Sequence, residues 1–199
     1  MFGLVSGFID WYFAKTEVNI LVLGLDNAGK TTFLEQTKLL HKGGGDGNAV
    51  HVPLDSILPT VGLNLGRVQT MGCDVTIWDL GGQQALRSIW DKYFADAHCI
   101  VFMVDSTDTD RFAEAASTMR KVLEHAGARG VPALVLANKQ DMPMASALAP
   151  MEALFEMDRV REQGRAAHLL PLCARDGTGM NEALAWALDT VRSSSQKNS

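Results

Sequence analysis

The sequence has little of several features that mark particular classes of protein. Only three of its 199 residues are cysteines, with no CxxC pair, which argues against a disulfide framework or a zinc site and indicates a reducing compartment. The net charge is −5, so the chain lacks the basic surplus typical of nucleic-acid binders, and we expect no nucleic-acid partner. No run of about 18 apolar residues occurs, so we expect no transmembrane helix.

Signals for processing and lipid attachment are also missing. The N-terminal segment lacks a basic stretch followed by a cleavage site, so we expect no secretory signal. Position 2 is Phe2 rather than glycine, and the segment 193–199 (SSSQKNS) contains no cysteine. We therefore expect neither N-myristoylation nor C-terminal prenylation.

Short apolar runs alternate with segments of helical periodicity. The predicted strands are 18–24, 62–69, 73–79, 98–104, 131–137 and 168–172. The predicted helices are 29–40, 86–95, 110–126, 146–157 and 179–191, and the glycine-rich segment 41–58 is predicted to be a loop. This alternation predicts an α/β fold with a mostly parallel six-stranded sheet and helices on both faces.

The domain organisation follows from the same pattern. Strands 62–69 and 73–79 are close enough to form a hairpin, which adds the one antiparallel strand. We expect a single domain over 17–192, preceded by an N-terminal amphipathic helix over 1–16 and followed by a polar tail over 193–199. Ligands in such sheets bind at the carboxyl ends of the strands.

A phosphate-binding loop follows the first predicted strand. Residues 24–31 (GLDNAGKT) match GxxxxGK[ST] in full, between a strand and a helix. The backbone N–H groups of such a loop converge on phosphate oxygens, Lys30 supplies a positive charge, and the Thr31 hydroxyl is a ligand for Mg²⁺. The predicted nucleotide-binding residues here are Gly24, Leu25, Asp26, Asn27, Ala28, Gly29, Lys30, Thr31 and Thr32. A glycine-bounded turn with an exposed lysine is the simpler alternative.

A second motif indicates which base is bound. Asn138-Lys139-Gln140-Asp141 follows the strand predicted over 131–137. A carboxylate such as Asp141 only accepts hydrogen bonds, and guanine presents two adjacent donors where adenine does not. Asn138 can donate to the purine N7, and the stem of Lys139 can lie across the ring. Cys173 and Ala174 follow the last predicted strand, where a backbone N–H could reach the guanine O6.

Four further residues are candidates for binding Mg²⁺ and sensing the terminal phosphate. Asp79 begins a DxxG motif (DLGG) at the end of a predicted strand and is placed to hold Mg²⁺ with Thr31. Gly82 could bring a backbone N–H to the γ-phosphate, and Gln83 beside it could orient the attacking water. Thr60, just before the hairpin, is the candidate second hydroxyl on Mg²⁺; a plain strand-flanking threonine is the alternative. Gln83 and Lys30 are the predicted catalytic residues.

The first residues carry an apolar stripe at helical spacing. Its members share one broad face: Phe2, Val5, Phe8, Ile9, Tyr12 and Phe13. Such a helix is too short to span a membrane and suits the membrane interface. Permanent docking of the helix on the protein body is the alternative that the residues leave open.

Together, the segments GLDNAGKTT, PTVGLN, WDLGGQ and NKQD resemble the ADP-ribosylation factor family of small GTPases, and the likeness covers residues 1–191. Within the family, MFGLVSGF and PALVLANKQD are most similar to the ADP-ribosylation-factor-related branch. The resemblance implies a P-loop small G domain that binds GTP or GDP with Mg²⁺ and hydrolyses GTP slowly. It also implies an exchange factor, an activating protein and effectors as partners, and we expect a monomer.

The resemblance carries further implications for the switch. A register shift of the hairpin, driven by GTP, would expel the N-terminal helix and couple nucleotide state to membrane attachment. The implied location is the cytoplasm and the cytosolic face of the Golgi apparatus and trans-Golgi network, with a role in vesicle traffic. Leu63, Trp78 and Tyr93 fall where the family has its hydrophobic effector triad, although Leu63 replaces the usual aromatic residue.

Two other classes of function are compatible with parts of this pattern. An ATP-dependent enzyme on the same fold would need a substrate domain or lid, and Asp141 argues against adenine. A non-hydrolysing, nucleotide-bound scaffold would have no use for Gln83. Comparing single-turnover GTP hydrolysis in the wild type and in Gln83→Leu separates a scaffold from a switch.

Overall fold

The computed structural model describes residues 16–41 and 54–197. The N-terminal helix predicted over 1–16 therefore lies outside the described residues, except for Thr16. Thr16 is the first residue of a strand and pairs with Cys73, so the predicted boundary at this point is wrong by one residue.

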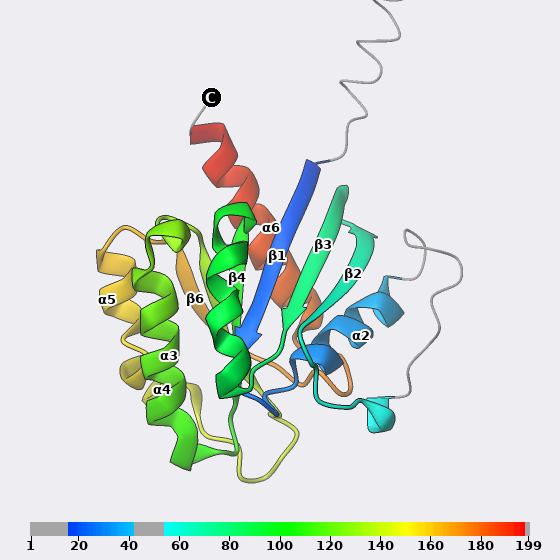
Figure 1. Ribbon diagram of the computed structural model, residues 1–199, viewed down its shortest axis with the longest axis vertical. Coiled ribbons are helices and arrows are strands. Elements are labelled where there is room, and N and C mark those ends of the chain that lie inside the picture. Colours follow the sequence, from blue (N-terminus) through cyan, green and yellow to red (C-terminus); the bar gives the residue numbers. More distant parts are fainter. Residues whose placement is uncertain (1–15, 42–53, 198–199) are drawn as a thin grey trace, which may run out of the picture.

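A six-stranded sheet forms the centre of the fold (Figure 1). Its strands are β1 (Thr16–Gly24), β2 (Leu63–Thr70), β3 (Cys73–Leu80), β4 (Cys99–Asp105), β5 (Ala133–Asn138) and β6 (Ala167–Pro171). Their spatial order is β2-β3-β1-β4-β5-β6; β2 runs antiparallel to β3, and all other neighbours are parallel. The predicted mixed sheet is confirmed.

Helices cover both faces of the sheet, as predicted (Figure 1). They are α2 (Lys30–Leu40), α3 (Phe112–Glu124), α4 (Leu148–Leu154), α5 (Met157–Glu162) and α6 (Met180–Lys197), with 3₁₀ segments η1 (Leu54–Ser56), η2 (Gln84–Asp96), η3 (Thr109–Arg111) and η4 (Ala126–Ala128). Alternate side chains of β1 enter different cores: Ile20 and Val22 pack with α2 and α6, and Leu21 and Leu23 pack with α3 and α4. Burial on both faces explains why β4 and β5, which are buried at every position, are apolar up to their last residue.

Three helical predictions differ from the structure. The helix predicted over 86–95 is a 3₁₀ segment, η2, in which only Trp90 and Phe94 are buried, so packing does little to enforce the α-helical pitch. The helix predicted over 146–157 divides into α4 and α5, because Glu156 adopts a left-handed conformation (φ 50°) between them. Helix α6 continues through the predicted polar tail to Lys197. Among the described helices, none has the length and apolar character needed to cross a membrane.

Candidate functional site

The predicted phosphate loop joins β1 to α2 at the carboxyl edge of the sheet. Lys30, the first residue of α2, is almost fully buried, and its Nζ donates to the Leu25 carbonyl (2.8 Å). Burial lowers the pKa of Lys30 to about 8, and the charges of Asp79 and Asp26 partly oppose that shift. A buried ammonium beside a helix N-terminus fits an anionic ligand, because a polyphosphate would restore the electrostatic stabilisation that burial removes.

The three candidate Mg²⁺ ligands converge from separate segments. The Thr31 hydroxyl lies 2.7 Å from the Thr60 hydroxyl and donates to Asp79 Oδ2 (2.7 Å). Thr60 Oγ1 also lies 3.3 Å from the same carboxylate oxygen. Thr60 and Asp79 are 29 and 48 positions from Thr31 in the sequence, and both lie next to Thr31 in the structure.

This cluster fits a hard cation that takes oxygen ligands. Asp79 is fully buried, and its Oδ1 has no hydrogen-bond partner among the described residues. Burial raises the pKa of Asp79, against the opposing effects of the Thr31 and Thr60 hydroxyls and the Lys30 charge. No group of three or more His, Cys, Asp or Glu side chains suited to a metal occurs in 16–41 or 54–197. Two hydroxyls and one carboxylate suit Mg²⁺, whose remaining ligands are typically phosphate oxygens and water.

A cavity of about 240 Å³ lies beside the phosphate loop. Its walls come from the phosphate-loop end, the NKQD segment and the loop after β6, together with Leu54 of η1: Gly29, Thr32, Leu54, Asn138, Lys139, Asp141, Met142, Cys173, Ala174 and Arg175. The two segments predicted to read the base are therefore brought together with the phosphate loop. This is the place where a base attached to loop-bound phosphates would lie.

Asn138 ties these three segments together. Its side-chain amide donates to the Ala28 carbonyl (2.8 Å), and its side-chain oxygen accepts from the Ala174 backbone N–H (2.9 Å). Asn138 therefore braces the phosphate loop against the loop after β6. Gly29 has φ 93°, and a Cβ there would lie 2.2 Å from Asn138 Nδ2, so only glycine permits this contact.

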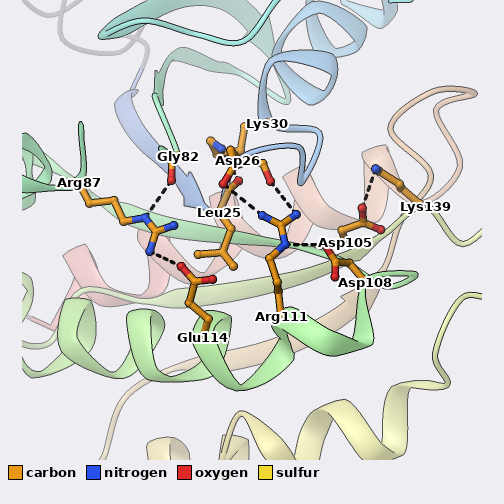
Figure 2. A network of polar contacts seen from close by, with 10 residues as sticks. All are labelled: Leu25, Asp26, Lys30, Gly82, Arg87, Asp105, Asp108, Arg111, Glu114 and Lys139. Carbon is orange, nitrogen blue, oxygen red and sulfur yellow. Dashed lines mark hydrogen bonds and ion pairs between the residues drawn. The ribbon is translucent and has the colours of Figure 1, made fainter. Parts of the chain in front are cut away.

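Lys139 and Asp141 of the NKQD segment are also held by side-chain partners. Lys139 Nζ forms an ion pair with Asp105 Oδ2 (2.6 Å), which fixes the direction of the lysine stem (Figure 2). Burial tends to raise the pKa of Asp105, but Lys139 and Thr107 hold it below its usual value. The Cys173 thiol donates to Asp141 Oδ1 (3.2 Å), and Asp141 is exposed toward the cavity that it lines. A carboxylate has further acceptor positions for a ligand.

The DxxG segment lies directly against the phosphate loop. A Cβ on Gly82 would be 2.4 Å from the Leu25 carbonyl carbon and 2.5 Å from the Asp26 nitrogen, so any side chain here would collide with backbone. Gln83 follows with an exposed side chain. The arrangement leaves the glutamine free to turn toward a phosphate held by the loop.

Arg87 and Arg111 belong to none of the motifs, but they hold the loops of the site in place (Figure 2). Arg87 donates through Nε to the Gly82 carbonyl (2.8 Å) and pairs through Nη1 with Glu114 on α3 (2.8 Å). Arg111, in η3, pairs with Asp26 Oδ1 (3.2 Å) and with Asp108. Arg87 therefore braces the DxxG segment from within the chain, and its guanidinium does not point outward as an additional catalytic cation.

We expect the Arg87 contact to matter most when the terminal phosphate is bound. In Arg87→Gln, loss of a charge-assisted bond to Gly82 should speed dissociation of a non-hydrolysable GTP analogue about tenfold, equivalent to about 1.4 kcal/mol. Dissociation of GDP should change less than about twofold, because GDP has no γ-phosphate beside Gly82. Arg120→Gln, which removes a surface pair with Glu156, is the matched control. Equal acceleration for both nucleotides would contradict this role.

Comparison with known proteins now decides the family. The sequence profile described as the ADP-ribosylation factor family matches residues 5–191. The chain belongs to the ADP-ribosylation factor family. It is 42% identical to human ADP-ribosylation factor-related protein 1 over 192 residues, covering 96% of this chain and 93% of the relative. It is 36% identical to ADP-ribosylation factor-like protein 3 of Saccharomyces cerevisiae over 189 residues, covering 94% and 92%.

A solved structure supports the same conclusion. The Arl6 BBS3 small GTPase from Trypanosoma brucei, with the bound nucleotide analogue GppNp, matches with a TM-score of 0.73 at 26% identity, over 89% of this chain and 98% of that chain. As a family member, the chain is a small GTPase that binds GTP or GDP with Mg²⁺ and hydrolyses GTP. Family membership also implies exchange factors, activating proteins and effectors as partners.

The predicted effector residues lie together on the hairpin and η2. Trp78 and Tyr93 make an edge-on ring contact with centroids 5.7 Å apart, and Leu63 is 38% exposed. Val61 and Leu65, near Leu63 in the sequence, are also exposed apolar residues, with exposed fractions of 83% and 50%. Leu65 pairs with Trp78 across the hairpin, so alternation along the strand could have identified it in the sequence.

Proposed function

We propose that this GTPase is a switch that acts in Golgi and trans-Golgi vesicle traffic by coupling its nucleotide to membrane attachment and effector binding. In this proposal, loop 24–32 and Lys30 hold the phosphates, Thr31, Thr60 and Asp79 hold Mg²⁺, and Asn138, Lys139, Asp141, Cys173 and Ala174 hold guanine. Gly82 and Gln83 act on the γ-phosphate and the attacking water. Bound Mg²⁺ would neutralise the charge that develops on the phosphates.

The observation that carries the switch is the contact between the Thr60 and Thr31 hydroxyls (2.7 Å). Thr60 lies three residues before Leu63, the first residue of β2. Gly62 also accepts a hydrogen bond from the Gly81 N–H (2.9 Å), so the segments before β2 and after β3 are joined. A cation or γ-phosphate that holds Thr60 would therefore also hold the start of the hairpin, whose exposed residues form the predicted effector surface.

The hairpin also adjoins the start of β1. Thr16 pairs with Cys73, the first residue of β3, and Arg192 of α6 donates to the Met71 carbonyl in the β2–β3 turn. The chain before Thr16 therefore joins the fold beside this turn. A shift of the hairpin would change the pairing of Thr16 with Cys73, at the point where the predicted amphipathic helix over 1–16 ends. This position supports coupling between nucleotide state and that helix.

Membrane coupling is tested with the full chain and liposomes. We expect more protein to float with liposomes when it is loaded with a non-hydrolysable GTP analogue than with GDP, because expulsion of the apolar stripe adds membrane-binding area. Phe8→Asp should abolish the difference. Equal flotation in both nucleotide states would contradict the proposal.

The cellular role is tested by imaging. A fluorescent fusion at the C-terminus should coincide with a Golgi marker in the wild type. Thr31→Asn, which removes a proposed Mg²⁺ ligand, should be diffuse in the cytoplasm. A wild-type protein that is uniformly cytoplasmic would argue against the Golgi assignment while leaving the GTPase intact.

A further inference from the structure

One wall of the nucleotide cavity comes from a segment that carries no nucleotide-binding motif. Leu54, in η1, lines the same cavity as Lys139, Asp141 and Cys173. The segment η1 contacts α2, the helix that opens at the phosphate loop, so Leu54 lies beside an element of the described fold. Its side chain is partly buried, although Leu54 falls within the segment 41–58 that was predicted to be a loop.

The physical need for such a wall follows from the shape of a purine. A nucleoside has an extended apolar surface, and a site that holds it tightly covers that surface while polar groups read its edge. Most of the other cavity walls are polar or small, and the Lys139 stem is held by its ion pair with Asp105. Leu54 and Met142 are the two large apolar side chains in the lining.

We propose that Leu54 is a positioning residue of the nucleotide site, which covers the nucleoside end of the bound nucleotide and slows its dissociation. The inference rests on the proposed assignment of this cavity to guanosine. Leu54 and Thr60 lie six positions apart on one short segment, and Thr60 contacts Thr31 at the phosphate end. The same segment therefore touches both ends of the site.

Dissociation kinetics test this inference on the full chain. A radiolabelled, non-hydrolysable GTP analogue is bound with Mg²⁺ and then chased with excess unlabelled analogue. Leu54→Ala should dissociate about fivefold faster, since truncation removes apolar contact worth about 1 kcal/mol. Leu54→Met, which conserves volume, should stay within about twofold of the wild type. Leu58→Ala is the matched control, because Leu58 is 80% exposed and does not line the cavity.

Competition by inorganic tripolyphosphate separates positioning from general loosening of the fold. Tripolyphosphate has no nucleoside, so its affinity should be the same in the wild type and in Leu54→Ala. The inference would be overturned if Leu54→Ala lowered the affinities for tripolyphosphate and for nucleotide by the same factor. It would also be overturned if nucleotide dissociated from Leu54→Ala at the wild-type rate. A wild-type chain that retains no guanine nucleotide would overturn the assignment of the cavity as well, so the two failures are distinguishable.

Discussion

Replacement of Asp141 by asparagine should lower the affinity for GDP by roughly 10⁴-fold, the discrimination that a site can achieve when it reads a polar edge. The carboxylate would accept from the ring N–H and the exocyclic amine of guanine, whereas an asparagine amide presents a donor to one of them. Xanthine has a carbonyl where guanine has that amine, so Asp141→Asn should gain affinity for xanthosine diphosphate. Equilibrium binding of the two nucleotides measures both changes.

The role of Asp141 is established only if Asp141→Asn both loses affinity for GDP and gains affinity for xanthosine diphosphate. Loss of GDP binding without a gain for the xanthine nucleotide would point to damage of the fold, for example through the Cys173 contact. Asp158→Asn is the control, because Asp158 is 90% exposed on α5 and should leave both affinities unchanged. If Asp141→Asn binds GDP as the wild type does, the assignment of the base-reading residue is wrong.

Replacement of Gln83 by leucine should slow single-turnover GTP hydrolysis by roughly 10²-fold, the cost expected when an attacking group loses its orientation. Gln83 is exposed and follows Gly82, which lies against the phosphate loop. Because the side chain would act on water rather than on the nucleotide, GTP affinity should change less than about twofold. Rapid mixing of GTP-loaded protein with Mg²⁺, followed by phosphate release, measures the step.

Gln84→Leu provides a matched control for Gln83→Leu. Gln84 is the next residue, is also exposed, and opens η2. Its substitution should leave hydrolysis unchanged. Equal rates in the wild type and in Gln83→Leu would remove Gln83 from the mechanism and would favour the non-hydrolysing scaffold considered from the sequence.

Short motifs predicted the parts of the site that local backbone geometry determines. The phosphate loop and the NKQD segment each follow a buried strand, and parallel strands bring their carboxyl ends to one edge. The sequence therefore predicted that both motifs lie at the carboxyl edge of the sheet, and in the structure Asn138 donates to the Ala28 carbonyl of the loop. The mostly parallel sheet with one antiparallel strand could be predicted as well, because strands alternate with helices and one tight hairpin interrupts that alternation.

The parts that depend on long side chains could not be predicted. Arg111 and Asp26 are 85 residues apart, and no spacing rule connects η3 with the phosphate loop. The direction of Arg87 depends on Glu114 of α3, which becomes a neighbour only after the helix packs on the sheet. Leu54 was missed because a single leucine within the predicted loop 41–58 carries no motif. Its role follows only from the cavity that the folded chain encloses.

The most direct test of the account is to identify the nucleotide that the protein carries. The purified full chain is denatured, and the released nucleotide is separated by chromatography and quantified against the protein. The account predicts about one GDP or GTP per chain, as expected for a guanine-nucleotide switch that releases its ligand slowly. Recovery of ADP or ATP instead would contradict the reading of Asp141 and the assignment of the cavity to guanine.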